Sequence, residues 1–323
     1  LPNLPAEDVP AGGKEGNSVL REWGSKPEPG RASRSHLDIS KSLGLVDYER
    51  GAKLGGTGFW VYRDLGARLE WALLNMFVDT HLAAGYSFVL PPHILNYECG
   101  FTAGQFPKFR EDVFLLASGE EKPRFLLPTA ETALISLHRD EVLREDELPR
   151  RYFAYTPCYR REAGGYGSNE RGMIRGHQFN KVELIQFTRP EDSPAAFESM
   201  VGSVENVMRA LGLHYRVVKL AAGDCSASMA RTQDIEVWIP SMQAYKEVSS
   251  VSSANDYQAR RGNMRFKRVS TGKNEFVHTL NGSCLATSRL FPAILEQLQN
   301  EDGSVSVPEP LRKYMGTDRM AIA

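Results

Sequence analysis

The chain has 323 residues, of which 41% are hydrophobic and 24% are charged, so it is long enough for one large domain and its composition excludes a disordered or fibrous protein. Its 39 basic and 40 acidic residues leave a net charge of −1, so any contact with nucleic acid requires a local basic patch. No apolar run reaches the ~18 residues of a membrane span. Four cysteines without a CxxC pair indicate neither a disulfide framework nor a zinc site. We therefore expect a cytoplasmic protein without membrane contact.

The first 35 residues contain two clusters of proline and glycine, the second at 26–30. Because these residues favour turns and irregular structure, we expect 1–35 to form an extended lead-in segment and 36–323 to form the main domain. The chain begins with Leu1 and has no initiator methionine. We therefore expect that an upstream segment has been removed or omitted.

Apolar residues recur at helical spacing in two long stretches. In 66–84 they cover two faces, so a helix there needs two packing partners. In 193–211 they form a single stripe that starts at a Ser-Pro pair and ends before a glycine, as helix boundaries often do. The last helix is expected at 285–299.

The strands are expected in runs between these helices. The first covers 86–90 and is stopped by two prolines, which cannot donate ladder hydrogen bonds. Several strands in succession, with helices grouped beside them, favour an α+β fold with an antiparallel sheet. The other expected strands are 124–127, 151–155, 179–187, 215–220, 234–239 and 245–250.

Two of these strands carry the residues best suited to bind a nucleotide. Arg160 and Glu162 would share one face of a strand that continues from 151–155. Phe179, Lys181 and Glu183 would share one face of the strand expected at 179–187. Guanidinium groups bind phosphate oxygens, an aromatic ring stacks on a base, and a carboxylate accepts a hydrogen bond from an exocyclic amine. Because the sequence has no glycine-rich phosphate loop of the known types, these residues would form a different kind of nucleotide site.

This stretch resembles the second signature motif of the class II aminoacyl-tRNA synthetases, which here begins at Tyr159-Arg160-Arg161-Glu162 and ends at Glu183. The residues from Gly85 to Pro92 resemble the first motif, and 281–289 resembles the third. Within class II the chain is similar to the seryl-tRNA synthetases over nearly its whole length. The segments that carry this similarity include 129–131, 175–183, 234–238, 247–250, 258–261 and 278–283.

The resemblance implies an α+β, mostly antiparallel domain that dimerises through the first motif, activates L-serine with ATP and Mg²⁺, and transfers serine to its tRNA. The implied ATP-binding residues are Arg160, Glu162, Arg175, Phe179, Glu247, Ser250 and Arg289, with Glu247 and Ser250 also placing Mg²⁺. The implied serine-binding residues are Thr129, Glu131, Arg160, Glu183, Asn281 and Ser283. Arg160 and Arg289 would be catalytic, because in-line attack on the α-phosphorus needs charge neutralisation and no general base.

Two departures from the family leave other functions open. The family's helical arm, which grips tRNA, normally precedes the segment that resembles 1–13, so we expect weak or absent tRNA binding without such an arm. The alternatives are an armless relative that activates serine or a similar small amino acid for a non-tRNA acceptor, and a non-catalytic dimeric paralogue. The second departure is a pair of substitutions: Cys284 replaces a common glycine beside Ser283 and is expected to narrow the pocket or to alter product handling, and Ser253 stands where the family often has asparagine.

A run of basic residues without an acidic one extends over 257–268. Such a run is typical of a solvated face, but it could also contact nucleic acid. Both interpretations stand at this point. The residues concerned are Arg260, Arg261, Arg265, Lys267 and Arg268.

Overall fold

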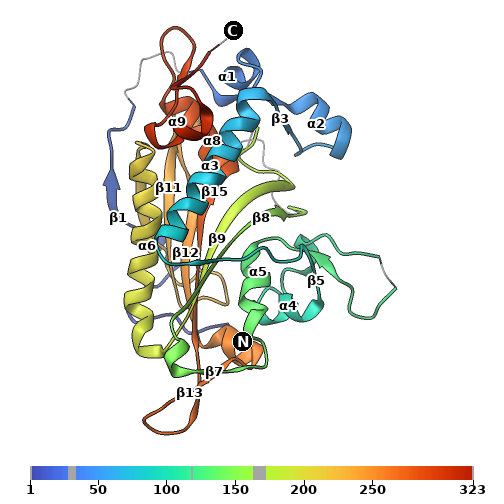
Figure 1. Cartoon of the computed structure of the whole chain (residues 1–323), viewed down its shortest axis with the longest axis vertical. Helices are drawn as coiled ribbons and strands as arrows, with labels where there is room; N and C mark the ends of the chain where they lie inside the picture. Colours follow the sequence, from blue (N-terminus) through green and yellow to red (C-terminus); the bar gives the residue numbers. More distant parts are fainter. Residues whose placement is uncertain (1, 28–33, 118, 163–171, 322–323) are drawn as a thin grey trace.

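The computed structural model describes residues 2–27, 34–117, 119–162 and 172–321. Its central element is an eight-stranded sheet with the order β1-β10-β11-β12-β15-β9-β8-β4 (Figure 1). All neighbouring strands are antiparallel except β4 and β8, which confirms the expected α+β fold. The strands are β1 (Ser18–Trp23), β4 (Ser87–Phe88), β8 (Arg150–Tyr159), β9 (Gln178–Thr188), β10 (Tyr215–Lys219), β11 (Arg231–Ile239), β12 (Ala244–Asn255) and β15 (His278–Ala286).

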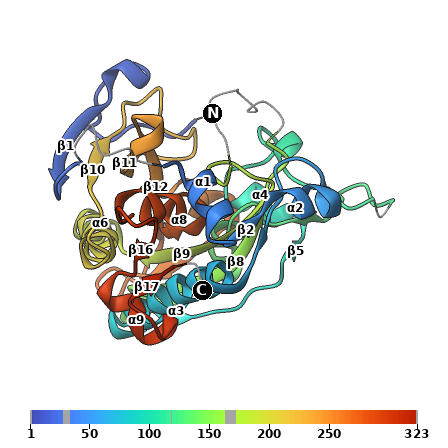
Figure 2. The same ribbon diagram turned by 90° about the horizontal axis from the view of Figure 1, so that it is seen from above.

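Three helices cover one face of this sheet: α3 (Asp64–Ala83), α6 (Ser193–Ala210) and α8 (Thr287–Gln297) (Figures 1 and 2). The helix α6 packs on β12 and β15, and α8 packs on β11 and β12. The apolar stripe predicted for 193–211 is buried in the main hydrophobic core. None of the described helices is long and apolar enough to cross a membrane.

Smaller elements lie around the sheet. The short helix α5 packs against β8 and β9, and α4 and β5 lie near it on the right of Figure 1. The remaining helices are α1 (His36–Ser42), α2 (Tyr48–Gly55), α4 (Tyr97–Thr102), α5 (Ala130–Leu134), α7 (Tyr257–Gly262) and α9 (Glu309–Met315). The remaining strands are β2 (Val46–Asp47), β3 (Val61–Tyr62), β5 (Ile94–Leu95), β6 (Phe125–Leu126), β7 (Val142–Arg144), β13 (Arg265–Lys267), β14 (Asn274–Phe276), β16 (Val305–Ser306) and β17 (Arg319–Met320).

Three of the departures from the sequence-based expectations concern β1, β15 and the last helices; the short helices α1, α2, α4, α5 and α7 were not expected either. Part of the segment 1–35 forms β1, which pairs with β10 at the edge of the large sheet; the domain boundary at 35 stays a prediction. The strand β15, in the stretch that resembles the third motif, was not expected, although it pairs with both β9 and β12. The helix expected as the last one is followed by α9.

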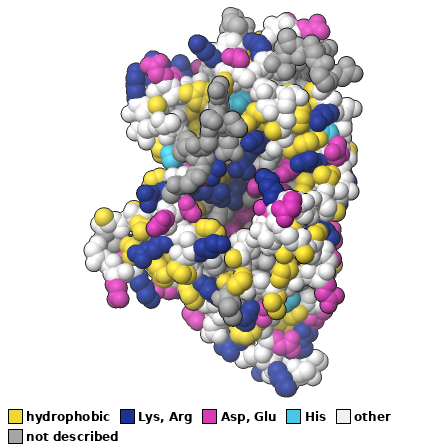
Figure 3. Space-filling view, turned by 180° about the vertical axis from the view of Figure 1, so that it is seen from behind, with side chains coloured by type: hydrophobic (Ala, Val, Ile, Leu, Met, Phe, Trp, Pro, Cys, Tyr) yellow, Lys and Arg dark blue, Asp and Glu magenta, His cyan; other side chains and the backbone are white. Residues whose placement is uncertain are grey.

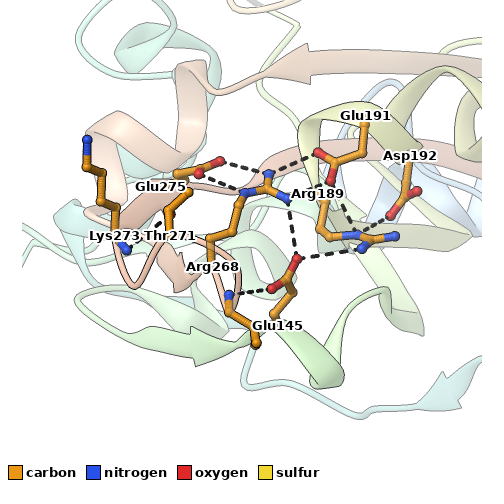
Figure 4. Close-up of polar contacts among 9 residues, drawn as sticks. Glu145, Arg189, Glu191, Asp192, Arg268, Thr271, Lys273 and Glu275 are labelled. Atoms are coloured by element: carbon orange, nitrogen blue, oxygen red, sulfur yellow. Dashed lines mark hydrogen bonds and ion pairs between the residues drawn. The ribbon is translucent and has the colours of Figure 1, made fainter.

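The basic run of 257–268 is largely paired within the protein. Arg268 makes ion pairs with Glu145, Glu191 and Glu275 (Figure 4), and Arg261 donates to two backbone carbonyls. These contacts tie the β13–β14 hairpin to the segment before α6. They favour a structural role for the run over contact with nucleic acid.

A buried carboxylate joins α3 to the sheet and to α8. Glu70 Oε1 accepts hydrogen bonds from Asn180 Nδ2 on β9 (2.8 Å) and from Thr287 Oγ1 at the start of α8 (2.6 Å). Burial raises the pKa of Glu70 from its ordinary value of 4.5 to about 7. Glu70 therefore ties α3 to the stretches that resemble the second and third class II motifs.

We predict that Glu70→Gln makes the stability of the protein less dependent on pH. Because folding raises the pKa of Glu70, this residue favours the folded state most below pH 4.5, and its contribution is lost as the pH rises to about 7. The neutral amide avoids this loss. At pH 8 the variant should gain about 1–3 kcal/mol in the free energy of unfolding relative to wild type, and near pH 4.5 the gain should vanish.

Urea unfolding at the two pH values measures this difference. Glu49→Gln is the matched control, because the Glu49 side chain is exposed on α2. Equal pH dependence of stability for Glu70→Gln and wild type would contradict the prediction.

Candidate active site

A cleft of about 540 Å³ opens at the sheet, and a pocket of about 40 Å³ adjoins it. Six residues line both, so the two form one continuous site. Basic and acidic side chains gather around a hollow near the middle of the molecule in Figure 3. The cleft is lined by ten of the twelve expected site residues, Thr129, Glu131, Arg160, Glu162, Arg175, Glu183, Glu247, Ser250, Asn281 and Ser283, and the pocket contains the other two, Phe179 and Arg289.

Two arginines are held in the site by backbone carbonyls. Arg160 Nε donates to Pro128 O (3.1 Å), and the Arg160 guanidinium carbon lies 5.2 Å from the centre of the Phe179 ring. Arg289 donates from Nη1 to Glu247 O (2.8 Å) and from Nε to Ile174 O (3.2 Å). Carbonyl groups orient a guanidinium without neutralising its charge, so Arg160 is suited to bind an anion. Arg289 Nη1 also lies 3.6 Å from Glu247 Oε2, so the charge of Arg289 is partly compensated.

Glu162 and Arg175 form an ion pair across the mouth of the site. Arg175 Nε donates to Glu162 Oε2 at 2.6 Å. The expectation that Arg160 and Glu162 share a strand face is wrong, because β8 ends at Tyr159 and Glu162 has a φ of 49° in the left-handed region. The turn at Glu162 directs its carboxylate toward Arg175.

A β-bulge brings Glu247 and Ser250 into the same cleft. The register between β11 and β12 shifts between the pairs Ile235–Ser249 and Glu236–Glu247. This shift lets two residues three positions apart line one site, which regular alternation would prevent. Burial and the nearby Glu247 carboxylate raise the pKa of Asp234, which pairs with Ser250 across the strands. Two carboxyl groups therefore lie close together at this edge of the cleft.

The deepest part of the cleft contains a buried ion pair. Lys181 Nζ lies 2.5 Å from Glu183 Oε2 and donates to Thr129 Oγ1 at 2.9 Å. Ser283 Oγ donates to the same Glu183 oxygen at 3.1 Å. The side chains of Lys181 and Glu183 are only 7% and 1% exposed, so each charge depends on the other for compensation.

Glu131 is the second carboxylate of this region. Gln258 Nε2 donates to Glu131 Oε1 at 2.8 Å, and Gln258 Oε1 accepts from Thr279 Oγ1 at 2.7 Å. Burial and the Glu183 charge raise the pKa of Glu131 to about 7, whereas Lys181 and Arg160 act in the opposite direction. A nearby cation would thus stabilise the ionised form of Glu131 at neutral pH.

The sequence analysis assigned no role to three residues that shape this site. Lys181 was placed on the correct face by strand alternation, but nothing in the sequence paired it with Glu183 and Thr129. Gln258 and Asp234 act on Glu131 and Glu247 through tertiary contacts. Except for their place in segments that resemble a family, these two residues carry no local signal.

The expectation that Cys284 narrows the pocket is wrong. Its side chain is fully buried in the main hydrophobic core, and it lines neither the cleft nor the adjoining pocket. Successive strand residues face opposite sides of a sheet, so Ser283 faces the cleft and Cys284 faces the core. All four cysteines are free thiols.

The described residues contain no group of three or more His, Cys, Asp or Glu side chains that could by themselves hold a metal ion. Glu247 and Ser250 instead offer one carboxylate and one hydroxyl at the acidic edge of the cleft. Oxygen donors of this kind suit Mg²⁺, which usually keeps several waters and takes further ligands from substrate phosphates. The donor set therefore fits a magnesium ion that arrives with a nucleotide.

Comparison with known proteins places these features in a family. Residues 114–298 match the family model described as the tRNA synthetase class II core domain (G, H, P, S and T). The chain is 63% identical to serine--tRNA ligase 2 of Clostridium acetobutylicum over 322 residues, which cover 99% of this chain and 76% of that protein. It is 49% identical to the serine--tRNA ligase of Syntrophobacter fumaroxidans, covering 98% and 74% of the two chains.

The fold matches solved structures of the same kind. The seryl-tRNA synthetase of Pyrococcus horikoshii complexed with ATP superposes with a TM-score of 0.94 at 34% identity, over 100% of this chain and 76% of that one. The cytoplasmic serine-tRNA ligase of Naegleria fowleri in complex with AMP gives a TM-score of 0.92 at 31% identity, over 99% and 77%.

We predict that Lys181→Met lowers the free energy of unfolding by about 3–5 kcal/mol, because it leaves the buried Glu183 charge uncompensated. Urea unfolding at pH 8 measures this loss. Adding Glu183→Gln to this variant should restore most of the stability, since both charges are then gone. Lys53→Met removes an exposed ion pair on α2 and should cost less than about 1 kcal/mol. A similarly small loss for Lys181→Met would contradict the prediction.

Proposed function

Because the chain belongs to the seryl-tRNA synthetase family of class II aminoacyl-tRNA synthetases, we propose that it activates L-serine with ATP and transfers the serine to its cognate tRNA. The observation that carries this proposal is the single cleft that brings together two carbonyl-held arginines, a stacking ring and a buried acidic pocket. A scaffold protein would have no physical use for this set of desolvated charges.

The first step joins serine to the α-phosphate of ATP. A carboxylate oxygen of serine attacks the α-phosphorus, the bond to the bridging oxygen of the leaving group breaks, and pyrophosphate departs. Arg160 and Arg289 would neutralise charge at the α-phosphate, and Phe179 and Glu162 would hold the adenine ring and its amine. The residues mainly position and neutralise the reactants, so no side chain is needed as a general base. In the second step a ribose hydroxyl of the tRNA attacks the serine carbonyl, and AMP departs.

ATP binding requires the ion pair between Glu162 and Arg175 to open in this mechanism. Glu162 would turn to the adenine amine, and Arg175 would move to the outer phosphates. Glu247 and Ser250 would hold Mg²⁺, which would supply neutralisation of phosphate charge. The closeness of the Asp234 and Glu247 carboxyl groups supports a cation at this edge.

The serine pocket is proposed at the deep end of the cleft. The serine ammonium would bind Glu131 and Thr129, and its hydroxyl would contact Glu183, Asn281 and Ser283. A site that hydrogen-bonds a hydroxyl group rejects an analogue without it, because the buried polar groups are then left unpaired.

Transfer to tRNA is favoured over the alternative acceptors, because the chain is 63% identical to a serine--tRNA ligase over 322 residues. The complete set of charged site residues argues against a non-catalytic paralogue. The described part of the basic run offers little for tRNA binding, since Arg261 and Arg268 are engaged within the protein. A cytoplasmic location stays a prediction from the sequence.

We predict that the protein catalyses serine-dependent exchange of pyrophosphate into ATP in the presence of Mg²⁺. Alanine should support this exchange at least ~10²-fold less well than serine, because it leaves Glu183 and its neighbours without a partner. Glu183→Ala should reduce this preference. Absence of exchange by folded protein would refute the proposed function. If Glu183→Ala lowers the exchange rate with serine and with alanine equally, the substrate hydroxyl does not bind at Glu183.

An apolar surface follows α3 and β4 and suggests a second subunit. Trp71 on α3 is 56% exposed and Leu90 after β4 is 70% exposed, and Leu82, Phe88 and Ile94 add to the exposed apolar residues of this region. Apolar patches of this kind mark interaction sites on soluble proteins. We propose that they form a two-fold homodimer interface built on 66–92 that buries more than the ~1,600 Å² of a standard complex.

Light scattering at micromolar concentration tests this proposal. Wild type should have twice the mass of the chain, and the double substitution Trp71→Asp/Leu90→Asp should shift it toward the monomer, because the buried carboxylates would lack partners. Val269→Asp is the matched control, since Val269 is 81% exposed in the β13–β14 hairpin. A monomeric wild type would contradict the proposed dimer.

A further inference from the structure

The proposed serine pocket contains a buried lysine that the mechanism above does not use. Lys181 and Glu183 are two residues apart on β9, so their side chains lie on the same face. Residues with small side chains flank them in the sheet. Glu183 pairs with Ala154 and Ser283, and Lys181 with Thr156 and Ala286. These neighbours leave room for the Lys181 ammonium to fold along the strand onto Glu183.

The hydrogen bonds of Glu183 are concentrated on one of its two oxygens. Oε2 is bound by Lys181 Nζ at 2.5 Å and Ser283 Oγ at 3.1 Å. No residue in the described part of the chain donates to Oε1. The arrangement keeps the carboxylate fixed and leaves one oxygen for a substrate group in the cleft.

The two carboxylates of the pocket differ in how their charges are compensated. Glu183 has the Lys181 ammonium, whereas Glu131 accepts from the neutral amide of Gln258. The Glu183 charge disfavours ionisation of Glu131, and Lys181 opposes this effect. The pocket therefore combines a neutralised pair with one carboxylate that lacks a cation of its own.

Building on the proposed function, we propose that Lys181 is a specificity-determining residue of the serine pocket. Its ammonium fixes Glu183 as an ionised acceptor for the substrate hydroxyl and leaves Glu131 as the carboxylate that binds the substrate ammonium. Without Lys181, Glu183 would compete with Glu131 for the substrate ammonium or take up a proton. In either case Glu183 would bind the substrate hydroxyl less well. Lys181 acts through Glu183 and is thus a positioning residue.

The test compares serine-dependent and alanine-dependent pyrophosphate exchange by wild type, Lys181→Met, Lys181→Arg, Glu183→Gln and the double variant Lys181→Met/Glu183→Gln. Wild type must show serine-dependent exchange; if it does not, the proposed function fails and the cause lies outside Lys181. With active wild type, Lys181→Met should lower the serine-over-alanine ratio of kcat/KM at least tenfold. Lys181→Arg should recover part of this ratio, because it keeps the positive charge beside Glu183.

The double variant separates action through Glu183 from a general structural effect. If Lys181 acts through Glu183, the double variant and Glu183→Gln should have the same serine-over-alanine ratio. Lys181→Met and Glu183→Gln each leave one buried charge unpaired, whereas the double variant leaves none. The double variant therefore keeps the test open where a single variant is poorly folded. A further tenfold loss of the ratio in the double variant would overturn the inference.

The pH profile gives a readout that a structural role would not move. In Lys181→Met, Glu183 loses its ammonium partner and should hold a proton to higher pH, so the acid limb of kcat/KM for serine should shift upward by about one pH unit or more. An unchanged ratio and an unchanged acid limb in folded Lys181→Met would overturn the inference. A tenfold rise in KM for ATP with an unchanged ratio would also overturn it and would assign Lys181 to the nucleotide.

Discussion

The antiparallel pairing of β9 with β8 on one side and β15 on the other is the constraint on which the site depends. Register fixes Glu183 opposite Ser283 and Lys181 opposite Ala286, and a shift by one residue would turn these charges into the hydrophobic core. The same pairing places Phe179 near Arg160. Three segments far apart in the chain thus supply one cleft because they are neighbours in one sheet.

Buried charge is the second organising feature of the molecule. Glu70, Lys181 and Glu183 are buried and Glu131 is partly buried, and each makes hydrogen bonds with neighbouring strands or helices. Such groups reduce the stability of the free protein unless they are fully compensated. A substrate with an ammonium group and a hydroxyl group supplies some of the missing partners, so selectivity and stability depend on the same residues.

The apolar surface of α3 and the site are physically connected through Glu70. This residue lies on the helix that carries Trp71, and it binds Asn180, which stands between Phe179 and Lys181 on β9. Trp71 also packs against Tyr155, whose hydroxyl donates to Asn180. A partner subunit seated on this face would therefore contact side chains that are linked through Asn180 to the proposed nucleotide site.

The sequence by itself determined the fold class, most strands of the large sheet, the helices 66–84 and 193–211 and, through the family resemblance, the twelve residues that the structure brings into one site. The strands and helices follow from local periodicity, and the site residues follow from motifs that resemble those of the family. Only the tertiary structure decided that Glu162 pairs with Arg175, that a bulge lets Glu247 and Ser250 converge, and that Cys284 faces the core. It also decided the partners of Lys181, Gln258 and Glu70. These contacts join segments about 50 to more than 200 residues apart, so they depend on strand register and packing. A single sequence carries no local signal for such contacts.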